Sequence, residues 1–329
     1  MGFADIVGHP KQLETLRLTL AHGRLHHAYL FVGPSGVGKK TIGLNLAKAI
    51  HCSAATADFC GKCADCARIQ DGNHPDVRFI EPLAGKKEIS IQQIRELEKY
   101  LNFRSFSGNR KIVILDPVTL MNLSAQNALL KTLEEPPKDS LLVLIAPSVG
   151  ELLPTLRSRC LRVSFAPLTR DQVARFLVAQ KKVPVEQAEL LAAISMGSLE
   201  AVAAVDPREL LARRQRWIGL LLPVAFGNYR ATAETAEALA ENKEESVRFL
   251  EWAESWYRDL LVYTLTQNQQ EVVNVDMLPQ IQQVSAAIKL EYLLGRIAEA
   301  KEAVGAIRRN LNRRMVIENL LLNARETRP

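Results

Sequence analysis

The sequence lacks a long apolar run: nowhere among its 329 residues do the roughly 18 apolar side chains of a membrane-spanning helix follow one another. The N-terminal segment MGFADIVGHPKQ has no basic stretch followed by an apolar one, so we expect no secretory leader. These absences predict a cytoplasmic protein that does not contact a membrane. Disorder is excluded for most of the chain, because 47% of its residues are hydrophobic and only 24% are charged.

Cysteine is scarce, and four of the five cysteines crowd into one short segment. They are Cys52, Cys60, Cys63 and Cys66, with the spacing C-x7-C-x2-C-x2-C. Thiols stay reduced in the cytoplasm, and cysteines separated by two residues form poor disulfides. Zinc binds four thiolates tetrahedrally, so we predict a structural Zn²⁺ module at 52–66 with no open ligand position for catalysis. The alternative is a set of unligated thiols, and the flanking His51 and His74 are interpreted as packing or surface residues.

Five short apolar runs alternate with stretches of helical periodicity in the first half of the chain. They are residues 28–32, 77–80, 111–115, 141–146 and 161–165. Strands separated by helices pair in parallel and are covered on both faces, so we predict an α/β domain with a five-stranded parallel sheet. Strand patterns stop after residue 168, and the chain from residue 209 onward is predicted to be helical. Trp217, Trp252 and Trp256 lie at core-like spacing on these helices and are interpreted as packing residues.

The segment GPSGVGKKT at 33–41 follows the first predicted strand and has the pattern of a phosphate-binding loop. Such a loop needs glycines that free its backbone N–H groups and a lysine that reaches the phosphates. The residues that meet these needs are Gly33, Gly36, Gly38 and Lys39. The next position should carry the hydroxyl that binds Mg²⁺, but Lys40 stands there and Thr41 comes one residue late. We predict a degenerate loop without Mg²⁺-dependent hydrolysis, and the sequence leaves open whether it binds ATP.

Asp116 directly follows the strand predicted at 111–115. This is the place of the Walker B acid, which positions Mg²⁺ in ATPases that have a phosphate-binding loop. In an active enzyme of the AAA+ type the next residue is a glutamate that orients the attacking water. Here Pro117 follows, and its side chain has no acceptor. We therefore interpret Asp116 as the relic of a Walker B site that has lost its catalytic base.

Two further runs carry a family resemblance. LMNLSAQNALLKTLEEPP at 120–137 and LPTLRSRC at 153–160 resemble the AAA+ module of DNA polymerase clamp-loader subunits. A four-cysteine insertion after the phosphate-loop helix is typical of the bacterial members. The resemblance implies an AAA+ ATPase-like domain at 1–166 with the zinc module at 52–66, a small helical lid domain at 167–207, and an all-α collar or oligomerisation domain at 208–329.

Active members of this family need two more groups, and the sequence departs from both. Pro147 stands where a polar sensor should end the run at 141–146, and Glu200 follows Gly-Ser-Leu where an arginine is expected. With Lys40 and Pro117, these departures imply a stator-like subunit without ATPase activity of its own, acting as a component of the clamp-loader ATPase and of the polymerase holoenzyme. The alternative is an active gamma/tau-type ATPase. A weaker alternative is a zinc-dependent DNA-binding protein. It is disfavoured because the cysteine segment holds a single basic residue, too few to contact DNA phosphates.

The run at 153–160 ends in Ser158, Arg159 and Cys160. In clamp loaders this motif presents an arginine finger to the ATP held by a neighbouring subunit, so the resemblance implies that role in trans for Arg159. Arg157 is a second candidate for orienting the segment. The implied partners are gamma/tau ATPase subunits, the delta subunit, the sliding clamp and, through the complex, primer–template DNA.

The front half of the chain also contains a basic tract. It is either a solvated surface or a contact for DNA phosphates, and it comprises Arg95, Lys99, Arg104, Arg110 and Lys111.

Overall fold

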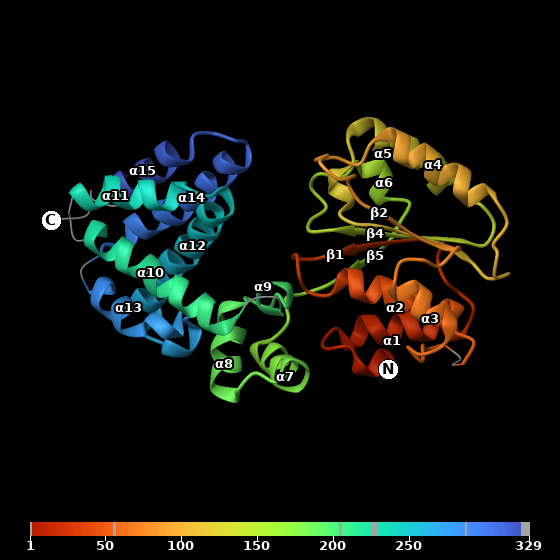
Figure 1. Ribbon diagram of the computed structural model, residues 1–329, viewed down its shortest axis with the longest axis horizontal. Coiled ribbons are helices and arrows are strands. Elements are labelled where there is room, and N and C mark those ends of the chain that lie inside the picture. The colour runs from red at the N-terminus through yellow and green to blue at the C-terminus, as the bar shows by residue number, and fades with distance from the viewer. Residues whose placement is uncertain (1, 55–56, 204–205, 226–228, 287, 324–329) are drawn as a thin grey trace. The chain divides into compact units, whose positions relative to one another are not determined.

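The computed structural model describes residues 2–54, 57–203, 206–225, 229–286 and 288–323. The chain divides into two compact units (Figure 1). The first unit comprises Met1–Lys182 and Gly197–Ala203, and the second comprises Val183–Met196 and Ala204–Pro329. The three-domain division with boundaries at 166/167 and 207/208 stays a prediction, and residues 55–56 of the predicted zinc module lie outside the described residues.

A five-stranded parallel sheet forms the centre of the first unit, which confirms the predicted α/β class. The strands are β1 (Ala28–Val32), β2 (Val77–Ile80), β3 (Lys111–Leu115), β4 (Ser140–Ala146) and β5 (Leu161–Ser164). Their order across the sheet is β2-β3-β4-β1-β5, and all neighbouring strands run parallel. The carboxyl ends of the strands therefore share one edge of the sheet, the carboxyl edge, and the amino ends share the opposite amino edge.

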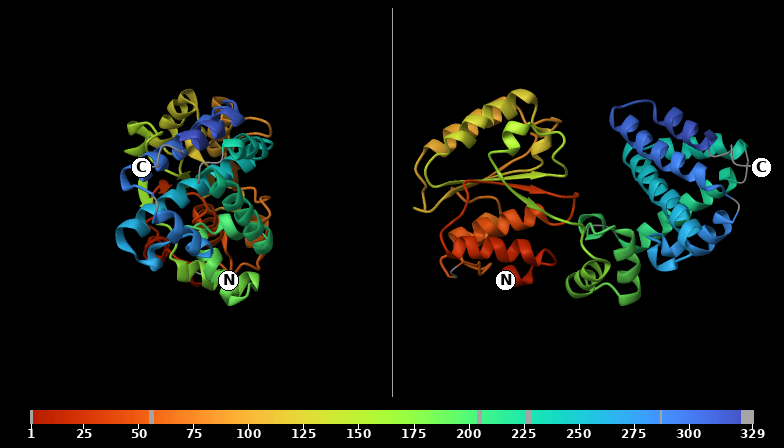
Figure 2. Two further views of the ribbon diagram at one scale, coloured as in Figure 1. Left: turned by 90° about the vertical axis from the view of Figure 1, so that its left-hand side faces the viewer. Right: turned by 180° about the vertical axis from the view of Figure 1, so that it is seen from behind.

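Helices cover both faces of the sheet, which explains why its central strands are continuous apolar runs (Figures 1 and 2). Side chains of β1 alternate between the faces, so Phe31 joins one core and Leu30 joins the other. One face packs against α1 (Pro10–Ala21), α2 (Lys39–His51) and α3 (Ala64–Gln70), and the other against α4 (Ile91–Asn102), α5 (Leu123–Glu134) and α6 (Pro154–Arg157).

Local sequence fixes where two of the helices of the first unit begin. At the start of α4 the Ser90 hydroxyl accepts a hydrogen bond from the Gln93 N–H. In turn, the Gln93 side-chain oxygen accepts one from the Ser90 N–H. Thr169 and Gln172 form the same reciprocal cap where the next long helix begins. The remaining helices of this unit are α7 (Arg170–Lys181) and α9 (Glu200–Ala203).

All secondary-structure elements that the structure describes in the second unit are helices, including the short 3₁₀-helices η3 (Gln269–Glu271) and η4 (Val275–Met277). Its α-helices are α8 (Val185–Ile194), α10 (Pro207–Ala225), α11 (Tyr229–Ala240), α12 (Lys243–Thr266), α13 (Leu278–Ser285), α14 (Leu290–Arg308) and α15 (Arg313–Asn323). Trp217, Trp252 and Trp256 are buried in its core, as predicted, with ring centroids 5.5 and 5.9 Å apart along the row. Among the described residues, no helix combines the length and the apolar character that crossing a bilayer demands.

A buried polar network ties the helices of the second unit together. The Asp259 carboxylate on α12 accepts the backbone N–H groups of Val273 and Asn274, at 2.9 and 2.6 Å, and the Asn274 side-chain amide at 2.7 Å. The side-chain carbonyl of Asn274 accepts from Arg214 on α10, which also donates twice to Asp276. Because these polar groups satisfy one another away from water, the network fixes one arrangement of α10, α12 and the turn that follows α12.

Replacing Asp259 by alanine should lower the free energy of unfolding of this unit by about 3–5 kcal/mol, because buried donors would lose their charged acceptor. The matched control is Glu234→Ala, which removes an exposed ion pair with Arg230 on α11 and should cost no more than about 0.5 kcal/mol. Urea unfolding followed by tryptophan fluorescence measures both variants, since all three tryptophans lie in this unit. Equal unfolding midpoints would contradict the structural role of Asp259.

Candidate functional site

The predicted phosphate loop lies between β1 and α2, at the carboxyl edge of the sheet. Gly36 and Gly38 have φ angles of 77° and 98°, a backbone conformation that residues with a Cβ rarely adopt. Gly33 is required for space, since a Cβ there would lie 2.2 Å from the carbonyl oxygen of Phe165. The three glycines of the pattern are therefore the residues that permit this tight turn.

Lys39 is buried inside the loop and directed at the loop's own backbone. Its Nζ donates to the carbonyl oxygens of Gly33 and Pro34, both at 2.6 Å. Burial lowers the pKa of the Lys39 ammonium group, and the charges of Asp116 and Glu200 oppose that shift. The side chain that reaches phosphates in an active loop thus closes the turn between β1 and α2.

The segment that contains α9 rests on the phosphate loop. The Leu199 N–H donates to the Gly36 carbonyl oxygen at 2.9 Å, and a Cβ added at Gly36 would meet the Ser198 hydroxyl at 2.0 Å. Burial raises the pKa of Asp116, and the Glu200 charge acts in the same direction while Lys40 and Lys39 oppose it. The charges of Lys39, Asp116 and Glu200 therefore influence one another beside the phosphate loop, and two of these three groups are carboxylates.

Two further departures, Lys40 and Pro147, also lie along the carboxyl edge. Lys40 forms an exposed ion pair with Glu81 at 3.4 Å and stands 5.9 Å from the centre of the Phe79 ring. Pro147 follows β4 directly and is exposed. Neither side chain provides an oxygen for Mg²⁺ or a hydrogen-bond acceptor for water.

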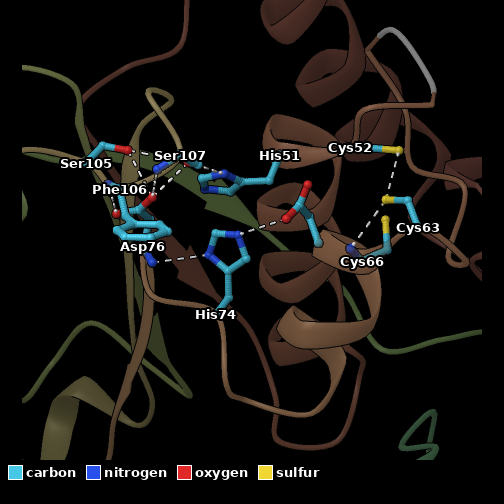
Figure 3. Close-up of polar contacts among 10 residues, drawn as sticks. His51, Cys52, Cys63, Cys66, His74, Asp76, Ser105, Phe106 and Ser107 are labelled. Atoms are coloured by element: carbon cyan, nitrogen blue, oxygen red, sulfur yellow. Dashed lines mark hydrogen bonds and ion pairs between the residues drawn. The ribbon is translucent and has the colours of Figure 1, made fainter.

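The four clustered cysteines meet at one point between α2 and α3. Their sulfur atoms all lie within 4.8 Å of one another, and those of Cys52 and Cys63 are 4.0 Å apart. Figure 3 shows three of the four cysteines, namely Cys52, Cys63 and Cys66. A tetrahedral Zn²⁺ with bonds of about 2.3 Å requires sulfur atoms roughly 3.8 Å apart, so the cluster has the size of a zinc site. Backbone N–H groups of Cys60, Cys63 and Cys66 point at neighbouring sulfurs at 3.3–3.5 Å, as thiolate ligands require.

The thiols of the cluster differ in acidity. Burial acts to raise the pKa of Cys63, but hydrogen bonds from the Cys66 N–H and other groups outweigh it and lower this pKa to about 6. Burial raises the pKa of Cys66 to about 12. Cys160, the cysteine outside the cluster, also has its pKa raised to about 12 by burial. Cys63 is thus the thiol of the cluster most readily deprotonated for metal binding.

A buried polar cluster lies beside the cysteine segment and was not predicted from the sequence. Asp76 is 1% exposed and accepts the N–H groups of Phe106 and Ser107 at 2.8 and 2.7 Å (Figure 3). Burial acts to raise the pKa of Asp76, but these hydrogen bonds outweigh it and lower the pKa below its ordinary value. His51 and His74 are buried beside it with ring centroids 4.4 Å apart, which fits their interpretation as packing residues. No spacing in the sequence marks Asp76, because its partners lie about 30 residues away.

The arginine segment lies at the opposite edge of the sheet from the phosphate loop. Arg159 lies two residues before the start of β5, whereas the loop follows β1. The two strands pair in parallel from Tyr29 with Leu161 to Val32 with Ser164. A strand of five residues spans roughly 16 Å. Arg159 is therefore out of reach of its own chain's phosphate loop.

Contacts within the chain hold the Arg159 side chain. One terminal nitrogen lies 2.6 Å from a Glu134 carboxylate oxygen, and the other donates to the Thr155 carbonyl oxygen at 2.8 Å. The Ser158 hydroxyl donates to the same carbonyl at 3.0 Å. The structure brings Arg159 and Ser158 together on an exposed turn, while Cys160 packs against the core of the α4–α6 face.

The basic tract is only partly available to a ligand. Arg95, Lys99 and Arg104 are exposed, but Lys111 is buried and its ammonium group donates to the Tyr100 carbonyl oxygen at 2.6 Å. Lys111 therefore belongs to the core of the sheet, and neither interpretation of the tract, a solvated surface or a contact for phosphates, holds for this residue.

Comparison with known proteins gives matches along most of the chain. A family model described as "DNA polymerase III, delta subunit" matches residues 8–169, and one described as "DNA polymerase III, delta subunit, C terminal" matches residues 209–326. DNA polymerase III subunit delta' of Pseudomonas aeruginosa is 32% identical over 309 residues, 90% of each chain. The Bacillus subtilis protein of the same name is 30% identical over 320 residues, 96% of each chain.

Relatives of the alternative type match over a shorter region. DNA polymerase III subunit tau/gamma of Haemophilus influenzae is 34% identical over 220 residues, which is 65% of this chain and 32% of that protein. The delta' proteins match over nearly their whole length, including the helical second unit. The chain belongs to the family of DNA polymerase III delta' subunits.

Proposed function

We propose that this chain is a non-hydrolysing, stator-like subunit of the DNA polymerase III clamp loader. It works in the cytoplasm, supplies Arg159 in trans to the ATP of a neighbouring gamma/tau ATPase subunit, and helps the complex load a sliding clamp on primed DNA. The other partners are the delta subunit and, through the complex, primer–template DNA. The observation that carries the proposal is the position of Arg159: a partly exposed guanidinium at the edge of the sheet remote from its own phosphate loop is placed to reach a neighbour's nucleotide and not its own.

The chain's own AAA+ site is proposed to be inactive. Hydrolysis needs a hydroxyl for Mg²⁺, a base for water and a cation near the γ-phosphate. Lys40, Pro117 and Glu200 stand at those three places, and Glu200 adds negative charge beside Lys39 and Asp116. ATP binding without hydrolysis is disfavoured by the same charge and by the two hydrogen bonds that hold Lys39 to its loop.

The four cysteines are proposed to hold a structural Zn²⁺. The sulfur separations and the backbone N–H groups directed at the sulfurs support this assignment. When bound, the ion would join the end of α2 to the start of α3 through Cys52, Cys60, Cys63 and Cys66. All four ligand positions come from the protein, so the ion would have a structural role.

Arg159→Ala should leave assembly intact but lower the DNA-stimulated ATPase of the reconstituted clamp loader about tenfold or more, since a finger supplied in trans contributes roughly 10³–10⁵ in rate where it has been measured. ATP turnover is measured with gamma/tau and delta subunits, sliding clamp and primed DNA, and size-exclusion chromatography confirms assembly. The matched control is Arg162→Ala, which removes an exposed guanidinium from β5 three residues away. Turnover of the Arg159 variant equal to that of the control would refute the finger role.

The isolated chain should hydrolyse no ATP above the buffer rate, because its site lacks the metal-binding hydroxyl and the catalytic base. The measurement is steady-state phosphate release at saturating ATP and Mg²⁺, compared between the wild type and Lys39→Ala. Identical background rates support the proposal. Turnover that Lys39→Ala abolishes would instead favour the alternative, an active gamma/tau-type ATPase.

Cys63→Ser should release the proposed zinc and destabilise the first unit, because loss of one thiolate leaves an incomplete tetrahedral site. Elemental analysis of the purified protein gives the zinc content, and thermal unfolding gives the stability. Cys160→Ser is the control, since this cysteine lies outside the cluster and should leave the zinc content at one per chain. A wild-type protein purified without zinc would contradict the metal assignment.

A further inference from the structure

We infer that Glu134 is a positioning residue for Arg159, holding the guanidinium at the amino edge of the sheet in the orientation from which it reaches a neighbour's nucleotide. The inference rests on the proposed role of Arg159 in trans. It concerns a residue that does not itself contact the nucleotide and acts only through the arginine.

The two terminal nitrogens of the Arg159 guanidinium are each held by a contact, and these contacts define its orientation. Glu134 at the end of α5 lies 2.6 Å from one terminal nitrogen, and the Thr155 carbonyl oxygen in α6 accepts from the other at 2.8 Å. A planar group held at both terminal nitrogens by two different helices has a fixed plane. Thr155 contributes a backbone atom whose place is set by its helix, and the Ser158 hydroxyl lies at the longer distance of 3.5 Å from the same nitrogen. Glu134 is therefore the charged side chain that orients the guanidinium.

The position of Glu134 in its helix is unfavourable by itself. It is the last residue of α5, and Glu135 follows as the C-terminal cap. The C-terminal end of a helix carries partial negative charge and disfavours carboxylates there. Pairing with Arg159 offsets this, so the carboxylate has an electrostatic reason to stay on the guanidinium and not turn into solvent.

The pair leaves the arginine able to bind a phosphate. A guanidinium has five N–H donors, and the contacts to Glu134 and Thr155 engage only part of them. The Arg159 side chain is 34% exposed and that of Glu134 is 50% exposed, so the pair is open on one side. Exposed ion pairs contribute little to stability. The consequence of this pair is therefore orientation: a long side chain ordered before assembly loses less freedom when the neighbour binds.

The test is ATP turnover by the fully reconstituted clamp loader carrying Glu134→Ala. We expect kcat to fall about three- to tenfold with KM for ATP unchanged, because ordering one long side chain only on assembly carries a penalty of that size. Glu134→Gln, which keeps an oxygen acceptor without the charge, should recover part of the loss. Glu135→Ala is the matched control, one residue along the chain and exposed, and should retain wild-type kcat.

The double variant Glu134→Ala/Arg159→Ala separates this inference from the proposed function. If Glu134 acts through Arg159, the double variant has the same kcat as Arg159→Ala alone. A further fall in the double variant, or a Glu134→Ala variant with the kcat of the Glu135→Ala control, overturns the positioning role. A raised kcat in Glu134→Ala also overturns it, because the pair would then restrain the finger. An Arg159→Ala complex with full activity refutes the finger itself.

Discussion

The parallel direction of the five strands is the constraint on which the rest of the first unit depends. Because all strands point the same way, every segment that follows a strand lies at the carboxyl edge and every segment that precedes one lies at the amino edge. The phosphate loop, Asp116 and Pro147 follow strands, whereas Arg159 precedes one. The fold thus separates a site for the chain's own nucleotide from a group offered to another subunit, before any side-chain contact is considered.

The fold was predictable because its signals are local. Each strand is a short apolar run bounded by polar residues, and the observed β1, β2 and β3 have the predicted bounds. The glycines and Lys39 were recognisable for a similar reason, since a tight turn around phosphate needs them at fixed spacing. Cys52, Cys60, Cys63 and Cys66 also lie close enough in sequence for their spacing to predict the cluster that the structure contains.

Contacts between distant segments could not be predicted in this way. Asp76 organises residues about 30 positions further along the chain, and Glu134 meets Arg159 across 25 positions. Asp259 likewise satisfies a turn that follows its helix. In each case the neighbouring sequence gives no signal for the acidic residue. Its role as a hydrogen-bond or ion-pair acceptor arises only when the fold brings the donors near. The burial of Lys111 could not be predicted either, because it depends on the Tyr100 ring, against which the fold places the lysine's ammonium group.

The retention of Lys39 in a site proposed to be inactive has a physical explanation in its own contacts. Its ammonium group donates to the carbonyl oxygens of two successive loop residues, Gly33 and Pro34, and so satisfies backbone acceptors of the turn. The same turn carries Gly36, on which the segment before α9 rests through the Leu199 N–H. Lys39 therefore stabilises the junction of β1, α2 and that segment, and this structural role persists whether or not phosphate ever enters the loop.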